Sequence, residues 1–202
     1  NSSLQSPLGM IVKICGITNV EDALCASDAG ADLLGFIFYP PSPRGIRADA
    51  ARHIIAELRN RTLTDRPLSA TRFVGVFVDE APEHMRRVMD EIGLDLAQLS
   101  GNEPPEALLA MRGRAYKAVR TAVDASRFVV PSTTAADEIR PDLLLEADHP
   151  TLYGGTGERA DDALAAQMSR QYRVLLAGGL TPENVAQAVR AARPWGVDVA
   201  SG

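Results

Sequence analysis

The chain has 202 residues, of which 46% are hydrophobic, and a formal net charge of −5 at pH 7. That length and composition suffice for one sizeable core, which excludes a disordered protein and predicts a single domain. Because the basic residues are scattered over an acidic chain, we expect no nucleic-acid partner. No apolar run approaches the roughly 20 residues that span a bilayer, so we expect no membrane partner either.

The start of the chain and its two cysteines bear on where the protein works. Residues 1–9 are mostly polar and lack the regions of a targeting signal, so we expect a disordered leader before a domain that covers residues 10–202. Cys15 and Cys25 are predicted to lie at a strand end and inside the next helix, which is a poor arrangement for a disulfide. Unpaired cysteines are typical of a reducing compartment, which predicts a cytoplasmic protein.

Short apolar runs alternate with amphipathic stretches along the chain. The expected helices include Glu21–Ala29, Ala48–Leu58, Pro82–Ile92 and Pro182–Ala192, and the expected strands are Ile11–Ile14, Leu33–Tyr39, Phe73–Val78, Leu96–Leu99, Ala115–Val119, Leu143–Leu145, Val174–Ala177 and Val197–Ala200. Eight such units predict an α/β protein, a parallel (β/α)8 TIM barrel, with the closing C-terminal helix absent from this chain. An open doubly wound sheet is the alternative, which we disfavour because no Gly-x-Gly-x-x-Gly follows an early strand.

The first strand ends in a thiol. The segment Lys13-Ile14-Cys15-Gly16-Ile17-Thr18 predicts a strand, a glycine turn and a helix start, with Thr18 and Glu21 at capping-box spacing. Barrel enzymes carry their chemistry at the carboxyl ends of strands, so Cys15 can face a substrate there. The alternative is a small buried hydrophobe. Lys13, on the same strand face, can support a thiolate or lie with its stem in the core.

Glycine-rich turns follow the late strands. They are Gly154-Gly155-Thr156-Gly157, Gly178-Gly179-Leu180-Thr181-Pro182 and Ser201-Gly202. We expect Thr181 to cap the next helix and Pro182 to be its first residue. Converging backbone amides and a helix N-terminus can hold a phosphate, although a single glycine pair is more often an ordinary turn. Two turns after consecutive late strands favour a phosphate site.

Two other strand ends carry charged groups. Three prolines stiffen the loop 39–45 that carries Arg44, whose planar guanidinium can clamp a carboxylate. Glu146 and Asp148 end the sixth strand, across the barrel from Cys15, where a general acid would be useful. Solvated side chains are the alternative for each of these groups. The three histidines are isolated and no Cys-x-x-Cys occurs, so we expect no metal and no cofactor.

Taken in order, these motifs resemble the phosphoribosylanthranilate isomerase family. The resemblance runs from Met10 to Gly202 and rests on Lys-Ile-Cys-Gly-Ile-Thr at 13–18, Gly-Phe-Ile-Phe-Tyr-Pro-Pro-Ser-Pro-Arg at 35–44, Val-Gly-Val-Phe-Val at 74–78, Tyr-Gly-Gly-Thr-Gly at 153–157, Ala-Gly-Gly-Leu-Thr-Pro-Glu-Asn-Val at 177–185 and Val-Asp-Val-Ala-Ser-Gly at 197–202.

The resemblance implies a reaction and roles for residues. The reaction is an Amadori rearrangement in tryptophan biosynthesis, which converts N-(5'-phosphoribosyl)anthranilate to 1-(2-carboxyphenylamino)-1-deoxyribulose 5-phosphate without a cofactor. Cys15 would remove the C2' proton, an acid at the sixth strand would protonate the ring oxygen, and Arg44 would hold the anthranilate carboxylate. The other implied substrate-binding residues are Gly154, Gly155, Thr156, Gly178, Gly179, Asp198, Ser201 and Gly202. A phosphosugar is thus the expected partner, and the enzyme would be a monomer or a homodimer.

Two positions depart from the family's pattern. The family's acid is an aspartate, and its register falls on Glu146, one methylene longer, with Asp148 as the alternative acid. Ser100 stands in Gln-Leu-Ser-Gly where the family usually has histidine. Two other readings stay open: a phosphosugar-binding barrel without catalysis or with altered specificity, and the indole-forming synthase of the next pathway step, for which Lys117 on the fifth strand is the candidate catalytic lysine.

Overall fold

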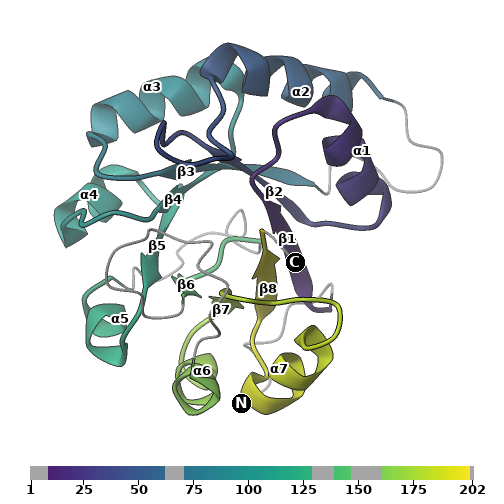
Figure 1. Ribbon diagram of the computed structural model, residues 1–202. Coiled ribbons are helices and arrows are strands. Elements are labelled where there is room, and N and C mark those ends of the chain that lie inside the picture. The colour runs from purple at the N-terminus through teal and green to yellow at the C-terminus, as the bar shows by residue number, and fades with distance from the viewer. Residues whose placement is uncertain (1–8, 62–70, 129–138, 147–160, 201–202) are drawn as a thin grey trace.

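The computed structural model describes residues 9–61, 71–128, 139–146 and 161–200, which form a closed eight-stranded barrel (Figure 1). The strands are β1 (Ile11–Cys15), β2 (Leu33–Ile37), β3 (Arg72–Phe77), β4 (Leu96–Leu99), β5 (Ala115–Val119), β6 (Leu143–Leu145), β7 (Val174–Leu176) and β8 (Gly196–Val199). Each strand pairs in parallel with the next, and β8 pairs with β1. The predicted α/β barrel is confirmed.

Helices surround this ring of strands in Figure 1. They are α1 (Val20–Asp28), α2 (Ala48–Asn60), α3 (Pro82–Ile92), α4 (Pro105–Ala110), α5 (Ala122–Phe128), α6 (Asp162–Ser169) and α7 (Val185–Ala192). None of the helices in the described ranges is long and apolar enough to cross a membrane. Of the predicted leader, only Gly9 is described, and within the described residues β8 is the last element.

Alternate residues of each strand point into the barrel or outward to the helices, and two separate apolar cores result. The inner core contains Ile11, Leu33, Val74, Leu96, Tyr116, Leu144, Leu175, Ala177 and Trp195. The larger outer core packs strand residues such as Leu34, Phe77 and Val197 against the helices. Because of this alternation, residues two or four positions after an inner-core residue on the same strand also point into the barrel.

Two helix starts differ from the prediction. The cap of α1 is Asn19, whose side chain accepts from the Asp22 amide at 2.8 Å, not Thr18. Helix α7 begins at Val185 rather than at Pro182, because residues 182–184 form a turn that precedes it. The Asn184 side chain accepts from the Thr181 amide at 2.9 Å and donates to the Gly179 carbonyl at 2.7 Å. The start of α7 is therefore tied to the glycine turn after β7.

Candidate active site

The carboxyl half of the barrel interior is polar, whereas the amino half is apolar. Counting in steps of two from inner-core residues brings a set of polar side chains to inward positions near the strand ends: Lys13 and Cys15 on β1, Gln98 and Ser100 at β4, Arg120 after β5 and Glu146 after β6. Asp198 on β8 joins this set, because it is the register partner of Lys13 and contacts its ammonium. Functional groups in such barrels lie at this end of the strands. Sequence reasoning missed Arg120, although its spacing from Tyr116 and Ala118 was a usable signal.

Cys15 is the last residue of β1 and is 7% exposed. Its sulfur fits because the facing residue on β2 is Gly35, where a Cβ atom would lie 2.8 Å from Sγ and 3.2 Å from the Cys15 Cα. Burial raises the pKa of the thiol, while Lys13 and Arg44 oppose that increase. The site therefore holds a thiol that needs its cationic neighbours to ionise.

Lys13 and Asp198 form an ion pair inside the barrel. The two residues are register partners on β1 and β8, and Lys13 Nζ lies 2.9 Å from Asp198 Oδ1. Burial would lower the pKa of Lys13, but Asp198 above all, with Cys15 and Tyr116, raises it above its ordinary value. Lys13 therefore remains an ammonium ion although it is fully buried.

Arg44 reaches across the end of β1. Its Nη1 donates to the carbonyl oxygen of Ala200, which follows β8, although Arg44 itself comes from the loop after β2. The guanidinium lies against Gly16, where a Cβ atom would be 2.9 Å from Arg44 Cδ. Gly16 also has a φ of 85°, a conformation that favours glycine. The predicted anion clamp thus lies directly beside the residue that follows Cys15.

Glu146 follows β6, and its side chain is 12% exposed. Burial raises the pKa of its carboxyl, and Arg120 is the strongest opposing influence, with Nη2 3.7 Å from Glu146 Oε2. Asp198 raises this pKa as well, while Lys117 and then Lys13 lower it. A raised pKa suits a carboxyl group that must carry a proton before it acts as an acid. Asp148, the alternative acid, lies outside the described residues.

Ser100 belongs to a buried hydrogen-bond chain. The Tyr116 hydroxyl donates to Gln98 Oε1 at 3.1 Å, and Gln98 Nε2 donates to Ser100 Oγ at 3.0 Å. All three side chains are buried in the part of the barrel below the strand ends. The serine that stands where the family usually has histidine is therefore satisfied locally, through a partner on its own strand.

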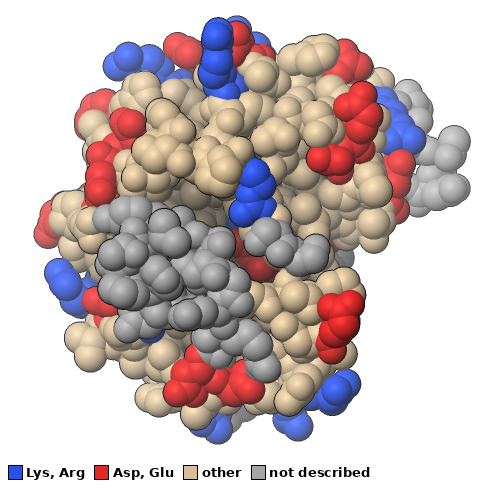
Figure 2. Space-filling view, in the orientation of Figure 1, with Lys and Arg blue, Asp and Glu red and all other residues tan. Residues whose placement is uncertain are grey.

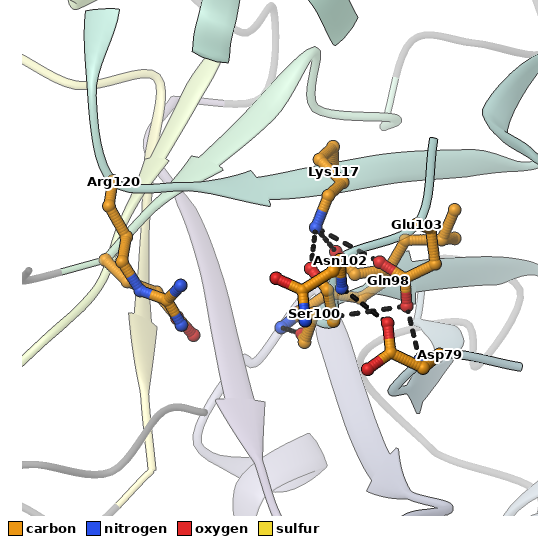
Figure 3. A network of polar contacts seen from close by, with 10 residues as sticks. Asp79, Gln98, Ser100, Asn102, Glu103, Lys117 and Arg120 are labelled. Carbon is orange, nitrogen blue, oxygen red and sulfur yellow. Dashed lines mark hydrogen bonds and ion pairs between the residues drawn. The ribbon is translucent and has the colours of Figure 1, made fainter. Parts of the chain in front are cut away.

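Lys117 points away from the barrel interior. It shares its strand face with Ala115 and Val119 of the outer core, and its Nζ donates to the carbonyls of Leu99 and Gly101 at 3.0 and 2.7 Å. Nζ also lies 3.1 Å from Glu103 Oε2. Figure 3 shows this contact among the residues after β4, with Arg120 apart from it. The candidate lysine of a synthase is thus outside the site.

The same cluster ties two loops together, and the sequence analysis did not find it. Glu103 Oε1 accepts from the backbone amides of Asp79 and Gly101, at 2.9 and 3.1 Å, so that one carboxylate bridges the loops after β3 and β4 (Figure 3). Burial lowers the pKa of Lys117, while Glu103 opposes that shift. These residues shape the rim beside Ser100 without pointing into the barrel.

The glycine turn after β7 is the described part of the predicted phosphate site. Gly178 and Gly179 have φ angles of 89° and 54°, a left-handed conformation that glycine adopts most readily. Within the described part of the chain, neither amide donates to a backbone acceptor. The remaining predicted residues, Gly154, Gly155, Thr156, Ser201 and Gly202, lie outside the described residues.

The site therefore combines a thiol, the carboxyl groups of Glu146 and Asp198, the buried Lys13 ammonium and the partly buried Arg120 guanidinium at one barrel end. Figure 2 shows an acidic group recessed at the centre of the molecule's face, next to a basic group, with both signs of charge spread around the rim. Among the described residues, no group of three His, Cys, Asp or Glu side chains is placed to hold a metal ion. A thiol and a carboxyl that face one barrel interior are groups typical of an enzyme of the proton-transfer class.

Comparison with known proteins identifies the family. The sequence matches the N-(5'-phosphoribosyl)anthranilate (PRA) isomerase family over residues 12–202. It is 44% identical over 192 residues to the N-(5'-phosphoribosyl)anthranilate isomerase of Trichlorobacter lovleyi, across 95% of this chain and 87% of that protein. The chain therefore belongs to the PRA isomerase family, which confirms the resemblance seen in its motifs, and it is an isomerase.

Solved structures agree with this assignment. The phosphoribosyl anthranilate isomerase of Thermotoga maritima is 38% identical with a TM-score of 0.76, over 96% of this chain and 88% of that one. Another structure of that protein describes monomers generated from its dimeric form. An isomerase in complex with reduced 1-(o-carboxyphenylamino)-1-deoxyribulose 5-phosphate is 36% identical with a TM-score of 0.72, over the same shares of the two chains.

Proposed function

We propose that the chain carries out its family's reaction at the carboxyl end of the barrel, with Cys15 as the base and Glu146 as the acid. The reaction is the Amadori rearrangement of N-(5'-phosphoribosyl)anthranilate to 1-(2-carboxyphenylamino)-1-deoxyribulose 5-phosphate, a step of tryptophan biosynthesis. The observation that carries the proposal is that Cys15 ends β1 and Glu146 follows β6 at the same end of one closed barrel. Lys13 and Asp198 act electrostatically on both the Cys15 thiol and the Glu146 carboxyl.

The acid opens the sugar ring. The Glu146 carboxyl donates its proton to the furanose oxygen while the bond between that oxygen and C1' breaks. The electrons of the broken bond stay on the oxygen, which becomes a hydroxyl group. The lone pair of the anthranilate nitrogen forms the C=N bond of a protonated Schiff base. The raised pKa of Glu146, caused by burial, keeps a larger fraction of this group protonated near neutral pH than an exposed carboxyl would have.

The base completes the isomerisation. The Cys15 thiolate takes the proton from C2', the C–H electrons form a C1'–C2' double bond, and the C=N electrons return to nitrogen. The resulting enolamine loses its hydroxyl proton and gains a proton at C1', which gives the ketone. Substrate and product have the same atoms and the same oxidation level overall, so this sequence consumes no second reactant.

Anionic groups at the two ends of the substrate fix its orientation. Arg44, which lies beside Gly16 at the end of β1, would hold the anthranilate carboxylate. The Gly178–Gly179 turn would hold the phosphate through its backbone amides, together with the predicted residues near 154–156 and 201–202. Held at both ends, the sugar lies between thiol and carboxyl, which replaces a chance encounter by a fixed geometry.

The test is the decay of phosphoribosylanthranilate fluorescence with purified variants. Cys15→Ser and Glu146→Gln are each expected to lower kcat by about 10²- to 10⁴-fold, because each removes a proton-transfer group. Cys25→Ser changes the exposed cysteine and is the matched control, with unchanged turnover expected. Arg44→Ala is expected to raise KM more than it lowers kcat.

Three outcomes would count against the proposal. Wild-type turnover in Glu146→Gln would remove that residue as the acid and leave Asp148 as the candidate. Full activity in Cys15→Ser would remove the thiol as the base. If the wild-type protein produced no catalysed decay at all, the alternative of a phosphosugar-binding barrel without activity would be favoured, and formation of indole product from the downstream substrate would favour the synthase.

We further propose where the protein works in the cell and how many copies of the chain it contains. Cys15 and Cys25 are both free thiols, one buried and one exposed, which suits a reducing compartment such as the cytoplasm. A relative is described as dimeric, and we propose that this chain works as a monomer or a homodimer, which sedimentation equilibrium would decide.

A further inference from the structure

The chain uses lysine at only two positions, Lys13 and Lys117, and both are buried. All its other basic side chains apart from histidine are arginines. Lysine differs from arginine in presenting a compact point charge with three donors. The ammonium at Lys13 lies inside the barrel, where its side chain is 0% exposed. A buried charge of this kind calls for a functional explanation, because a buried ion pair is weak evidence for stability.

The position of Lys13 links the strand of the base to β8. Lys13 lies two residues before Cys15 and points to the same side of β1. Its Nζ donates to Asp198 Oδ1 at 2.9 Å, and its charge favours the ionised form of the Cys15 thiol, which lies buried on the same strand face. The same ammonium thus contacts a fixed carboxylate and lies on the strand face that carries the sulfur of the proposed base.

We propose that Lys13 is a positioning residue for the base: its ammonium holds and stabilises the Cys15 thiolate, and Asp198 anchors that ammonium between β1 and β8. The proposal rests on the proposed function, since it assumes that the thiolate is the reacting form. It adds a residue whose task is to make the thiolate available, without contact between Lys13 and the substrate.

Three charged groups and burial set the balance between thiol and thiolate at Cys15. Lys13 on β1 and Arg44 after β2 stabilise the thiolate, whereas Asp198 on β8 destabilises it and burial does so most strongly. Tyr116 on β5 faces the same group of charges, and burial raises the pKa of its phenol. With burial dominant, loss of the Lys13 ammonium would leave the thiol protonated over a wider pH range.

The test measures the Cys15 thiol directly. In a Cys25→Ser background, the rate of iodoacetamide alkylation of Cys15 is followed against pH by peptide mass spectrometry, with thermal unfolding recorded for each variant. Lys13→Met is expected to raise the thiol pKa by about one to three pH units, the range for loss of one nearby opposite charge. Lys117→Met removes the other lysine, outside the barrel, and is expected to leave the thiol pKa unchanged.

A second variant is expected to shift the thiol pKa of Cys15 in the opposite direction. Asp198→Asn removes the anion and leaves the ammonium free for the sulfur, so the thiol pKa is expected to fall. A thiol pKa within 0.3 pH units of wild type in folded Lys13→Met overturns the proposal; if that variant does not fold, an unchanged or higher thiol pKa in Asp198→Asn overturns it. Because the readout is alkylation, it stands apart from the proposed function, which fails on the turnover of Cys15→Ser.

Discussion

Glu146 experiences two opposing influences, because burial raises the pKa of its carboxyl and the Arg120 guanidinium, 3.7 Å away, lowers it. The cation comes from the residue after the neighbouring strand β5. Arg120 therefore lowers the fraction of the Glu146 carboxyl that burial keeps protonated.

Removing Arg120 tests this influence. In Arg120→Gln, the opposing effect is gone, so the pKa of Glu146 is expected to rise further. The limb of the kcat/KM profile that belongs to Glu146 should then move to higher pH, since kcat/KM reports groups of the free enzyme. Arg127→Gln, on the exposed side of α5, serves as the control. A limb that stays in place or moves to lower pH would contradict the assignment.

At this scale the sequence predicted that Cys15 and Glu146 lie at strand ends, because each stands at the end of an apolar run, and that Arg44 lies in the loop after the second strand. It did not predict the pairing of Asp198 with Lys13, which depends on the register between the first and last strands. It also missed Glu103, whose partners lie on two other loops. Contacts between distant segments need the closed barrel, and no local pattern encodes them.

Among the secondary-structure elements, the pairing of β1 with β2 leaves room for the thiol. The register places Gly35 opposite Cys15, and the Gly35 carbonyl accepts from the amides of Gly16 and Ile17 at 2.9 and 3.0 Å. A side chain at position 35 would meet the Cys15 backbone as well as its sulfur. Because the Cys15 backbone is fixed in the sheet, a rotation of the Cys15 side chain alone would not remove the clash.

Gly35→Ala is therefore expected to lower activity by about 10²-fold, as a misplaced catalytic group does. Gly75→Ala is the matched control: a Cβ there would meet Leu94 and Phe77, 2.7 Å away in the outer core, far from the thiol. Both variants should lose thermal stability, but only Gly35→Ala should lose kcat out of proportion. Equal losses of kcat in the two variants would contradict the role given to this pairing.

The presence of each strand and helix was easier to predict from the sequence than the residue at which it begins. The strands Leu96–Leu99, Ala115–Val119 and Leu143–Leu145 and the helix Pro82–Ile92 have the predicted bounds. The starts of α1 and α7 were wrong because neighbouring polar residues compete to cap the same helix. Asn19 caps α1 in place of Thr18, and Asn184 bonds back to Thr181, so the turn at 182–184 comes before the regular helix.

For the whole molecule, the polar groups at the carboxyl end of the barrel lower the stability of the fold. A buried carboxyl with a raised pKa destabilises the fold wherever it is ionised, since the unfolded chain ionises more easily. This effect is absent below the ordinary pKa of the group, grows as the pH rises through that value, and is complete above the raised pKa. The carboxyl that the proposed function needs at position 146 therefore lowers the free energy of unfolding when it is ionised.

Glu146→Gln is expected to be more stable than wild type at pH 8, while its activity falls. For a domain of this size, each 1 kcal/mol gained would raise Tm by about 2–4 °C. The gain should shrink at pH 5, where the wild-type carboxyl is more fully protonated. Calorimetric scans at both pH values check this, and a variant that is less stable at pH 8 would contradict the account.

The overall architecture followed from the βα period, because eight apolar runs separated by amphipathic stretches have few parallel arrangements. The barrel's closure by β8 on β1 confirms that prediction. Several predicted phosphate-binding residues lie outside the described part of the chain, so the phosphate site as a whole remains a prediction.

The most direct measurement is a crystal structure of this protein with reduced 1-(o-carboxyphenylamino)-1-deoxyribulose 5-phosphate, the compound bound in a relative. The account predicts the carboxylate on Arg44, the phosphate against the Gly178–Gly179 turn, and the sugar's C2' next to Cys15 Sγ with Glu146 on its other side. A ligand whose sugar contacts neither the thiol nor the carboxyl would contradict it.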